Sequence, residues 1–380
     1  MKVMMKKFFG IISILTIIGA CSDDSIGEGE PNPSPGEGEM FERSSMLVNW
    51  ADNIIIPAYT EFSLDLATLK ASLEAFQSDV NETNLIELRS SWIAAYITWQ
   101  HVAMFEIGPA ESVGYQLNMN IYPTDAEKIE GFIASGNYDL SLSSNRDAKG
   151  FPALDYLING LGDTDAGIVA RFNGADSASI FTFMNTVLDN MIDLTEVVLG
   201  EWNSGYRDTF VANDGASATA STDRLVNDYI FYFEKYLRAG KMGIPLGVFS
   251  DSPLPQNVEA YYKSDISNTL FLEGLAAIQN FFNGNHYNSN TNGESLASYL
   301  DDLNTVKGGE DLTLLINNQF DAAREAVSGL SPFRSEIEGN TPPTNMLLAY
   351  DEVQKVVPLL KVDMVSAMSI SIDFVDADGD

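Results

Sequence analysis

The chain has 380 residues, of which 54 are acidic and 21 are Lys or Arg, so its formal net charge is −33. A charge of this sign and size disfavours nucleic acid and anionic membrane surfaces as partners. The single cysteine excludes a disulfide within the chain and any site built on several thiolates. With 45% apolar residues, the chain is long enough for one large or two ordinary domains.

Residues 1–20 have the pattern of a bacterial lipoprotein signal peptide. Three lysines precede an apolar stretch, residues 8–20, which is too short to span a bilayer. The stretch ends in Ile18-Gly19-Ala20-Cys21, which resembles the lipobox where lipoprotein signal peptidases cut. We therefore expect Cys21 to be the lipidated first residue of the mature protein, with its lipid as the contact to the membrane.

Residues 21–40 are predicted to form a disordered acidic tether. Acidic residues alternate there with Gly, Pro and Ser, and no basic residue is present, so the segment cannot bury a core. Its first residues, Ser22-Asp23-Asp24, resemble the signal that directs some bacterial lipoproteins to the cell surface. The expected location is therefore the outer membrane, facing either the cell surface or the periplasm.

Beyond the tether, apolar residues recur at spacings of three and four, as they do on one face of an α-helix. The clearest such pattern runs from Leu85 to Ala103, through Trp92 and Trp99. Strand-like alternation is rare, so the predicted fold class is all-α. Further helices are predicted at 177–202, 222–238, 312–330 and 346–364.

Prolines and turn-forming residues divide these helices. Pro57 and Pro358 fall inside helical patterns and are expected to kink or interrupt them. We expect two helical bundles in tandem, residues 41–212 and 213–380. The turn-rich segments that separate helices are 108–124, 203–221, 243–257 and 283–294.

The chain contains only two histidines, which limits its catalytic chemistry. His101 and His286 cannot supply a site built on several imidazoles, and neither belongs to an H-E-x-x-H zinc motif. His101 is expected at a helix surface or interface, and His286 in an Asn/Gly-rich surface loop. No phosphate loop, dinucleotide-binding glycine pattern or nucleophile elbow is present.

Two acidic residues are candidates for a site. Glu106 continues the apolar stripe of the helix before it and should point inward, where a carboxylate needs a basic side chain, backbone N–H groups or a metal. Asp155 lies in a compact predicted helix, Gly150 to Gly160, close to its N-terminus. The helix dipole alone would account for an acid at that position.

Five short motifs follow one another along the chain: Trp92 to Pro109, Gly150 to Gly160, Lys241 to Gly247, Ser264 to Ser267 and Phe374 to Asp380. Together they resemble the imelysin-like family of bacterial envelope proteins. The resemblance implies two helical bundles in tandem with a site in the groove between them, and an association with iron uptake. Members of the family have also been classed as metallopeptidases.

This chain departs from the family signature, Gly-x-His-x-x-Glu. The corresponding stretch, Gly150 to Asp155, has Pro152 in place of the histidine and Asp155 in place of the glutamate. Proline has no nitrogen that could bind a metal or carry a proton, so the chemistry of that histidine is in doubt here. The groove residues that the resemblance implies are Glu106, Asp155, Lys241, Ser264 and Ser267.

Some of these residues have simpler explanations. Ser264 could be an N-cap with Asp265 in the first turn of a helix. The final residues, 376–380, resemble the start of a calcium loop but end before its remaining ligands.

We expect a non-catalytic lipoprotein that binds a small ligand, or a divalent or ferric cation, in the groove between the bundles. The signature histidine is missing, which argues against an enzyme. A metallopeptidase and a scaffold that docks an envelope protein are the alternatives.

Overall fold

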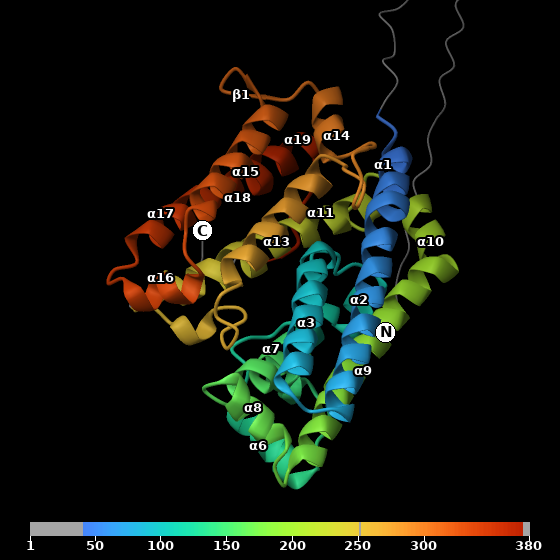
Figure 1. The fold of residues 1–380 in the computed structure, drawn as a ribbon. Coiled ribbons are helices and arrows are strands. Elements are labelled where there is room, and N and C mark those ends of the chain that lie inside the picture. Colours follow the sequence, from blue (N-terminus) through green and yellow to red (C-terminus); the bar gives the residue numbers. More distant parts are fainter. Residues whose placement is uncertain (1–40, 251, 375–380) are drawn as a thin grey trace, which may run out of the picture. The chain divides into compact units, whose positions relative to one another are not determined.

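Residues 41–250 and 252–374 are described by the computed structural model (Figure 1). The predicted signal peptide, Cys21, the tether and the calcium-like ending at 376–380 all lie outside this part of the chain. Within it, no helix is both long enough and apolar enough to cross a bilayer.

The all-α fold class is confirmed. The described chain consists of helices, apart from one hairpin of two-residue strands and one isolated bridge. The elements up to residue 212 are α1 (Arg43–Asn49), η1 (Trp50–Ile55), α2 (Ile56–Ser78), α3 (Glu82–Val102), α4 (Pro109–Val113), α5 (Tyr115–Met119), α6 (Ala126–Ser135), η2 (Ser143–Ala148), α7 (Gly150–Asp155), η3 (Tyr156–Gly160), α8 (Asp165–Phe172), α9 (Ser177–Glu201), η4 (Trp202–Tyr206) and α10 (Arg207–Ala212).

The second half of the chain is also helical, and it carries the hairpin. Its elements are α11 (Ser221–Phe231), η5 (Tyr232–Gly243), α12 (Ile244–Leu246), η6 (Pro255–Asn257), α13 (Ser267–Phe282), α14 (Leu296–Asp302), β1 (Val306–Lys307), β2 (Glu310–Asp311), α15 (Leu312–Ser328), α16 (Phe333–Gly339), α17 (Thr344–Gln354), α18 (Val356–Pro358), η7 (Leu359–Met364) and α19 (Val365–Met368).

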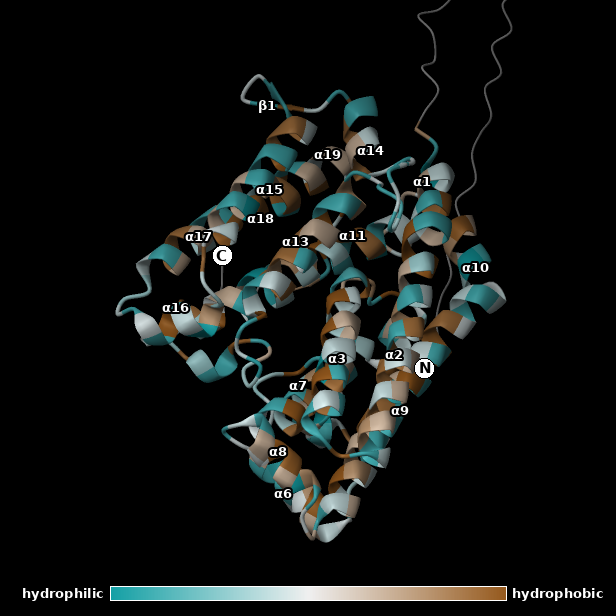
Figure 2. Ribbon diagram, viewed as in Figure 1, coloured by the Kyte–Doolittle hydropathy of each residue, from teal (hydrophilic) through white to brown (hydrophobic). Residues whose placement is uncertain are grey.

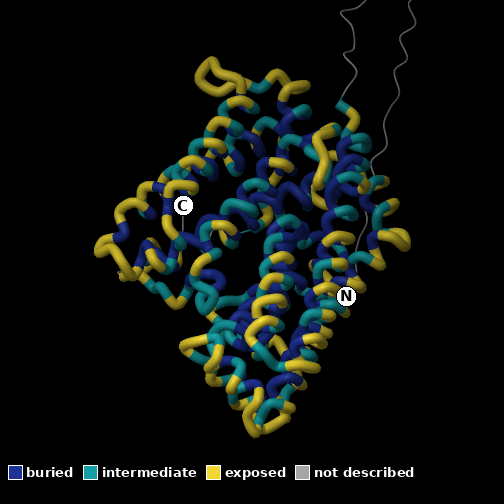
Figure 3. Tube along the Cα trace, viewed as in Figure 1, coloured by how far each residue is buried: buried dark blue, intermediate teal, exposed yellow. Residues whose placement is uncertain are grey.

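Helix α3 is central to the first half. Asn81 caps it by accepting a hydrogen bond from the backbone N–H of Asn84 at 2.9 Å. Its predicted apolar face, which includes Trp92 and Trp99, is buried, and α3 packs against α2. Hydrophobic and hydrophilic residues alternate along the helices (Figure 2), and buried positions gather where helices face one another (Figure 3).

Helices from the two halves pack directly on each other. Helix α3 contacts α13, and the residues from Phe41 onward group into one compact unit. The boundary that we predict between residues 212 and 213 stays a prediction.

Sequence patterns missed some helices and misplaced others. The helical pattern around Pro57 belongs to α2, whose bounds we did not predict. Pro57 lies in its first turn, where proline is tolerated, and Tyr59, Phe62 and Leu66 mark its buried face. The segments predicted as turns at 108–124 and 203–221 contain α4, α5 and α10. These helices have only five or six residues, which is too short for an apolar period to show.

Two of the predicted helices are irregular. The 346–364 pattern is interrupted at Lys355, between α17 and α18, three residues before Pro358. The helix predicted at 222–238 begins as α11 and then widens into the π-helical η5. A π-helix has a different repeat from the 3.6-residue period that the sequence analysis assumed.

Gly150, the first residue of α7, is required by both its backbone conformation and its surroundings. Its φ is +71°, and a Cβ atom built there would lie 2.1 Å from the carbonyl oxygen of Met119. All six residues of α7 are buried. A side chain at this position would therefore displace the segment that carries Pro152 and Asp155.

We predict that Gly150→Ala lowers the free energy of unfolding by on the order of 4 kcal/mol or more, because the clash is with backbone. Gly136 is the matched control: its φ is +63°, and a Cβ there would meet nothing within 4 Å. Gly136→Ala should therefore show only the left-handed strain of about 1–2 kcal/mol. Urea denaturation measures both, and equal losses would contradict the close approach at Gly150.

Candidate functional site

Asp155 ties the signature segment to the second half of the chain. Its carboxylate accepts hydrogen bonds from the backbone N–H groups of Tyr262 at 2.8 Å and Lys263 at 2.9 Å, and from the side chain of Asn159 at 3.0 Å. The side chain is only 1% exposed. Burial raises the pKa of Asp155 to about 7, while the hydrogen bonds and the charge of Lys263 act in the opposite direction.

A cavity of about 200 Å³ lies beside this carboxyl group. Tyrosine, proline and aliphatic side chains supply most of its walls, and Asp155 is the only acidic residue among them. No histidine lines it. The lining residues are Tyr122, Pro123, Thr124, Pro152, Asp155, Gln256, Val258, Ala260, Tyr261 and Tyr262.

A buried ion pair, Lys241 with Glu259, lies next to the residues that line the cavity. Lys241, in η5, donates hydrogen bonds to Glu259 and, at 2.9 Å, to the side-chain oxygen of Gln100 in α3. Lys241 and Glu259 are only 3% and 1% exposed. Burial lowers the pKa of Lys241, and contact with Glu259 opposes that shift.

The network continues into the first half of the chain. Asn120 donates to Glu259 at 2.7 Å and accepts a hydrogen bond from the hydroxyl of Tyr96, in α3, at 2.6 Å. Glu259 is also adjacent in sequence to two cavity residues, Val258 and Ala260. Burial, and then the charge of Glu259, raise the pKa of the cavity residue Tyr122 well above its usual value, so this phenol stays protonated.

The two predicted serines support the backbone near the cavity and do not line it. Ser264 has a φ of +63°, and its N–H donates to the carbonyl oxygen of Ala260 at 2.8 Å. It does not cap α13, because the residue before that helix is Ile266. Ser267 is buried at the start of α13, where its hydroxyl accepts the N–H of Phe333 at 2.9 Å.

Glu106 points inward, as predicted, but belongs to a different place. Its carboxylate accepts the N–H of Gln116, at the N-terminus of α5, at 2.9 Å. Burial raises the pKa of Glu106 to about 7, and the charges of Asp228 and Glu111 add to the shift. Of the three kinds of partner considered for this carboxylate, the described residues supply a backbone N–H group. It does not line the Asp155 cavity.

The structure therefore brings Asp155, Lys241 and the Ser264 segment to one region and leaves Glu106 outside it. Sequence reasoning missed Glu259, Asn120 and Tyr122. The one available signal was an acidic residue, Glu259, between the apolar Val258 and Ala260.

The described residues do not assemble a metal-binding cluster from ionisable side chains. Nowhere in 41–250 or 252–374 do three His, Cys, Asp or Glu residues come together as they would around a metal ion. The oxygens of Asp155 already accept three hydrogen bonds. The carboxylate therefore has at most one lone-pair site left for a bare cation.

Taken together, these features define a helical protein in which a segment that begins at Gly150 carries a buried carboxyl group to the edge of a small cavity lined mostly by tyrosine, proline and aliphatic side chains. The family model Imelysin matches residues 55–360. The chain therefore belongs to the imelysin family.

One curated relative is similar in sequence. It is Iron-regulated protein A of Synechococcus elongatus, which is 22% identical over 150 residues. That match spans 39% of this chain and 37% of the relative, so the chain matches only about a third of that protein's length.

Two solved structures share the fold. One, from Parabacteroides distasonis, is described as an iron-regulated protein A precursor; the TM-score is 0.69 at 15% identity, covering 86% of this chain and 97% of the other. The second is an imelysin-like protein from Psychrobacter arcticum, with a TM-score of 0.67 at 15% identity, covering 88% and 97%. At these identities the likeness shows the fold alone.

We predict that Lys241→Met lowers the free energy of unfolding by about 3–5 kcal/mol, because Glu259 is left buried without its cation. The double variant Lys241→Met/Glu259→Gln should lose less free energy of unfolding than the single variants Lys241→Met and Glu259→Gln lose in sum, since no unpaired charge remains in it. Urea denaturation of all three measures the coupling.

The control for this pair is Lys70→Met, because the partner of Lys70, Asp189, is 54% exposed. The free energy of unfolding of Lys70→Met should be at most about 1 kcal/mol below that of the wild type. Additive losses at Lys241 and Glu259 would show that the two side chains do not interact.

We also predict a pH dependence that originates at Asp155. Because the folded-state pKa is raised to about 7, its stabilising contribution is complete below the unfolded pKa, near pH 4, and is lost as the pH rises through about 7. As the pH rises from 5 to 8, the titration of Asp155 should therefore reduce the free energy of unfolding by about 2–3 kcal/mol.

Asp155→Asn should therefore flatten the decline in stability across this pH range, as measured by urea denaturation at each pH. The exposed Asp163, in the turn before α8, gives the control Asp163→Asn, which should keep the wild-type slope. An unchanged slope in Asp155→Asn would refute the assignment.

Proposed function

We propose that this chain is a non-catalytic binding protein of the bacterial cell envelope, held at the outer membrane by lipid on Cys21, whose ligand occupies the Asp155 cavity. One observation carries the proposal: the segment that corresponds to the family signature lines a cavity with Pro152 in place of the histidine and with Asp155 held by backbone N–H groups. The signal-like sequence at residues 1–24 supports the location.

Hydrolysis at this cavity is not favoured by the side chains present. A metallopeptidase needs a metal-bound water and a group that takes up its proton. Pro152 stands where the family has histidine, and both oxygens of Asp155 are engaged by backbone N–H groups of Tyr262 and Lys263. The segment from Gly150 to Asp155 therefore lines the cavity and holds the backbone at Tyr262 and Lys263 in place.

The chemistry of the walls favours a small, uncharged ligand with substantial apolar surface. Tyr122 keeps its proton, and Asp155, with a pKa of about 7, is partly neutral near physiological pH. Tyrosine and proline side chains offer apolar contact area, with hydroxyl groups for a few directed hydrogen bonds.

An iron-related role is supported by the name of the curated relative, Iron-regulated protein A. The chain would then bind iron as a neutral complex with an organic chelator. A bare ferric or divalent cation is less suited, because the described residues bring no three His, Cys, Asp or Glu side chains together around it.

The test is calorimetric titration of the purified full chain. The probes are bare Fe³⁺, Zn²⁺ and Ca²⁺, the neutral ferric complex of acetohydroxamic acid, and phenol as an aromatic fragment. We expect heat from the neutral probes and none from the bare ions. Heat from a bare ion that disappears in Asp155→Asn would contradict the proposal.

Gln256 provides a matched pair of variants, since it is exposed and lies on the cavity wall. Gln256→Trp should obstruct the cavity and weaken binding of the neutral probes at least tenfold, whereas Gln256→Ala should leave the affinity within about threefold. Equal affinities in the two variants would place the ligand elsewhere.

A further inference from the structure

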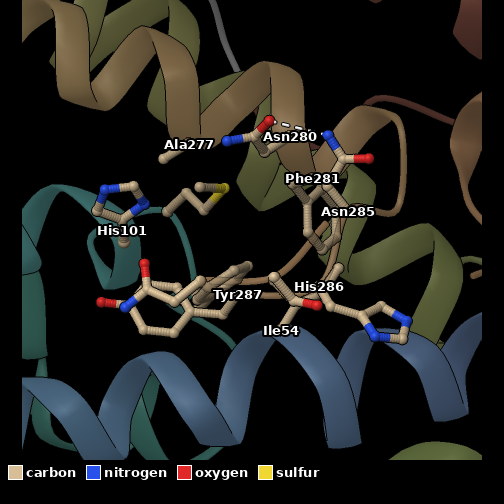
Figure 4. A pocket seen from close by; sticks show the side chains of 12 residues that line it. Ile54, His101, Ala277, Asn280, Phe281, Asn285, His286 and Tyr287 are labelled. Atoms are coloured by element: carbon tan, nitrogen blue, oxygen red, sulfur yellow. Dashed lines mark hydrogen bonds between the residues drawn. The ribbon is translucent and has the colours of Figure 1, made fainter. Parts of the chain in front are cut away.

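A second cavity, about 180 Å³ in volume, lies where the loop of residues 283–294 folds over α3, α13 and η1. Both histidines of the chain line it, although the sequence analysis placed them in unrelated settings. Figure 4 shows the rings of His101 and His286 far apart across the group of side chains, with Tyr287 between them. The two imidazoles therefore do not form one metal site.

The loop that covers this cavity is held in place by the N-terminal helix. The amide of Asn49 donates to the carbonyl oxygens of Gly284 at 3.1 Å and Glu294 at 3.0 Å, at the two ends of the loop. Asn49 is only 4% exposed. The N–H of Tyr287 also donates to the carbonyl oxygen of Asn53 at 2.8 Å. The cavity is thus largely formed before any ligand arrives.

The cavity has an apolar base and a polar rim. Phe105 and Phe281 are 1% exposed, and they form the base together with Met104. Asn288 and Ser289, on the loop, are exposed at the rim. A ligand could therefore enter from solvent and place an apolar face against the buried rings.

None of the lining residues is Asp, Glu, Lys or Arg, although a fifth of the chain is charged. The polar groups are side-chain amides, hydroxyls and imidazoles, with Asn280 and Asn285 joined by a hydrogen bond of 3.0 Å (Figure 4). Amides both donate and accept hydrogen bonds, which suits a ligand whose own groups do the same, such as hydroxyls. The lining therefore offers a charged ligand no Asp, Glu, Lys or Arg side chain, and the imidazole of His101 already faces Glu273 at 3.3 Å.

The aromatic rings do not form a slot for a flat heterocycle. The rings of His101 and Tyr287 meet edge to face, with centroids 5.5 Å apart and an interplanar angle of 74°. Phe105 and Phe281 are also steeply inclined, at 61°. A nucleobase is best held between parallel rings, whereas a sugar needs one apolar face and hydrogen bonds around its edge.

We propose that this cavity is a second ligand site, which takes one uncharged saccharide ring. The volume agrees with a single ring, because sites for larger, drug-sized ligands are about 300–1,000 Å³. The proposal does not depend on the function assigned to the Asp155 cavity, since the two cavities share no lining residue.

The experiment is titration of the full chain with N-acetyl-D-glucosamine and with methyl α-D-glucopyranoside, with saturation-transfer NMR as the readout. D-glucuronate and adenosine are titrated in the same way for comparison. At least one neutral sugar should bind, and D-glucuronate should bind more weakly than the sugar that does. Failure of both neutral sugars, tighter binding of glucuronate, or tighter binding of adenosine would overturn the proposal.

Two loop variants and one helix variant locate the site. Asn280→Ala, at an exposed position of α13, should weaken sugar binding about threefold to tenfold, as expected for one neutral hydrogen bond. Ser289→Trp should obstruct the rim and abolish binding. Asn290→Ala, on the same loop but outside the lining, should have no effect. Equal affinities in all three variants would overturn the proposal, and an unchanged melting temperature shows that each variant is folded.

Discussion

The arrangement around the Asp155 cavity depends on one buried ion pair, Lys241 with Glu259. An ion pair removed from water is stable only when its remaining donors and acceptors are also satisfied. Gln100 and Asn120 supply those hydrogen bonds from the first half of the chain. The pair therefore makes the packing of the two halves specific, because sliding one past the other would leave a charge buried without its partners.

Asp155 and Glu106 show a second use of buried acids in this protein. Asp155 binds two consecutive backbone N–H groups of the segment that includes Tyr262, and Glu106 binds the first turn of α5. A carboxylate can accept several N–H bonds, so it can hold a turn that has no regular hydrogen-bond partner of its own. Acids that look like catalytic or metal-binding candidates in the sequence thus hold backbone in the fold.

This use of the acids has a functional consequence. Once they are engaged with backbone and with Lys241, both cavities have linings dominated by uncharged groups, although the protein carries a net charge of −33. The acidity lies on the surface, where it contributes to solubility and to the choice of partners. The linings of the two cavities therefore offer shape, apolar contact and a small number of hydrogen-bonding groups.

Sequence by itself determined the helical class, the buried face of α3 and the inward direction of Glu106, because these follow from local periodicity. The order of its short motifs also pointed to the imelysin family. Only the tertiary structure decided that Glu259 completes the Lys241 site, that Asp155 anchors residues 262 and 263, and that His101 and His286 line one cavity. Asp155 lies 107 and 108 residues before its two backbone partners, and Lys241 lies 18 residues before Glu259. The π-helical turns η3 and η5 also shift side chains from the positions that a regular helix predicts. A local pattern contains no information about such partners.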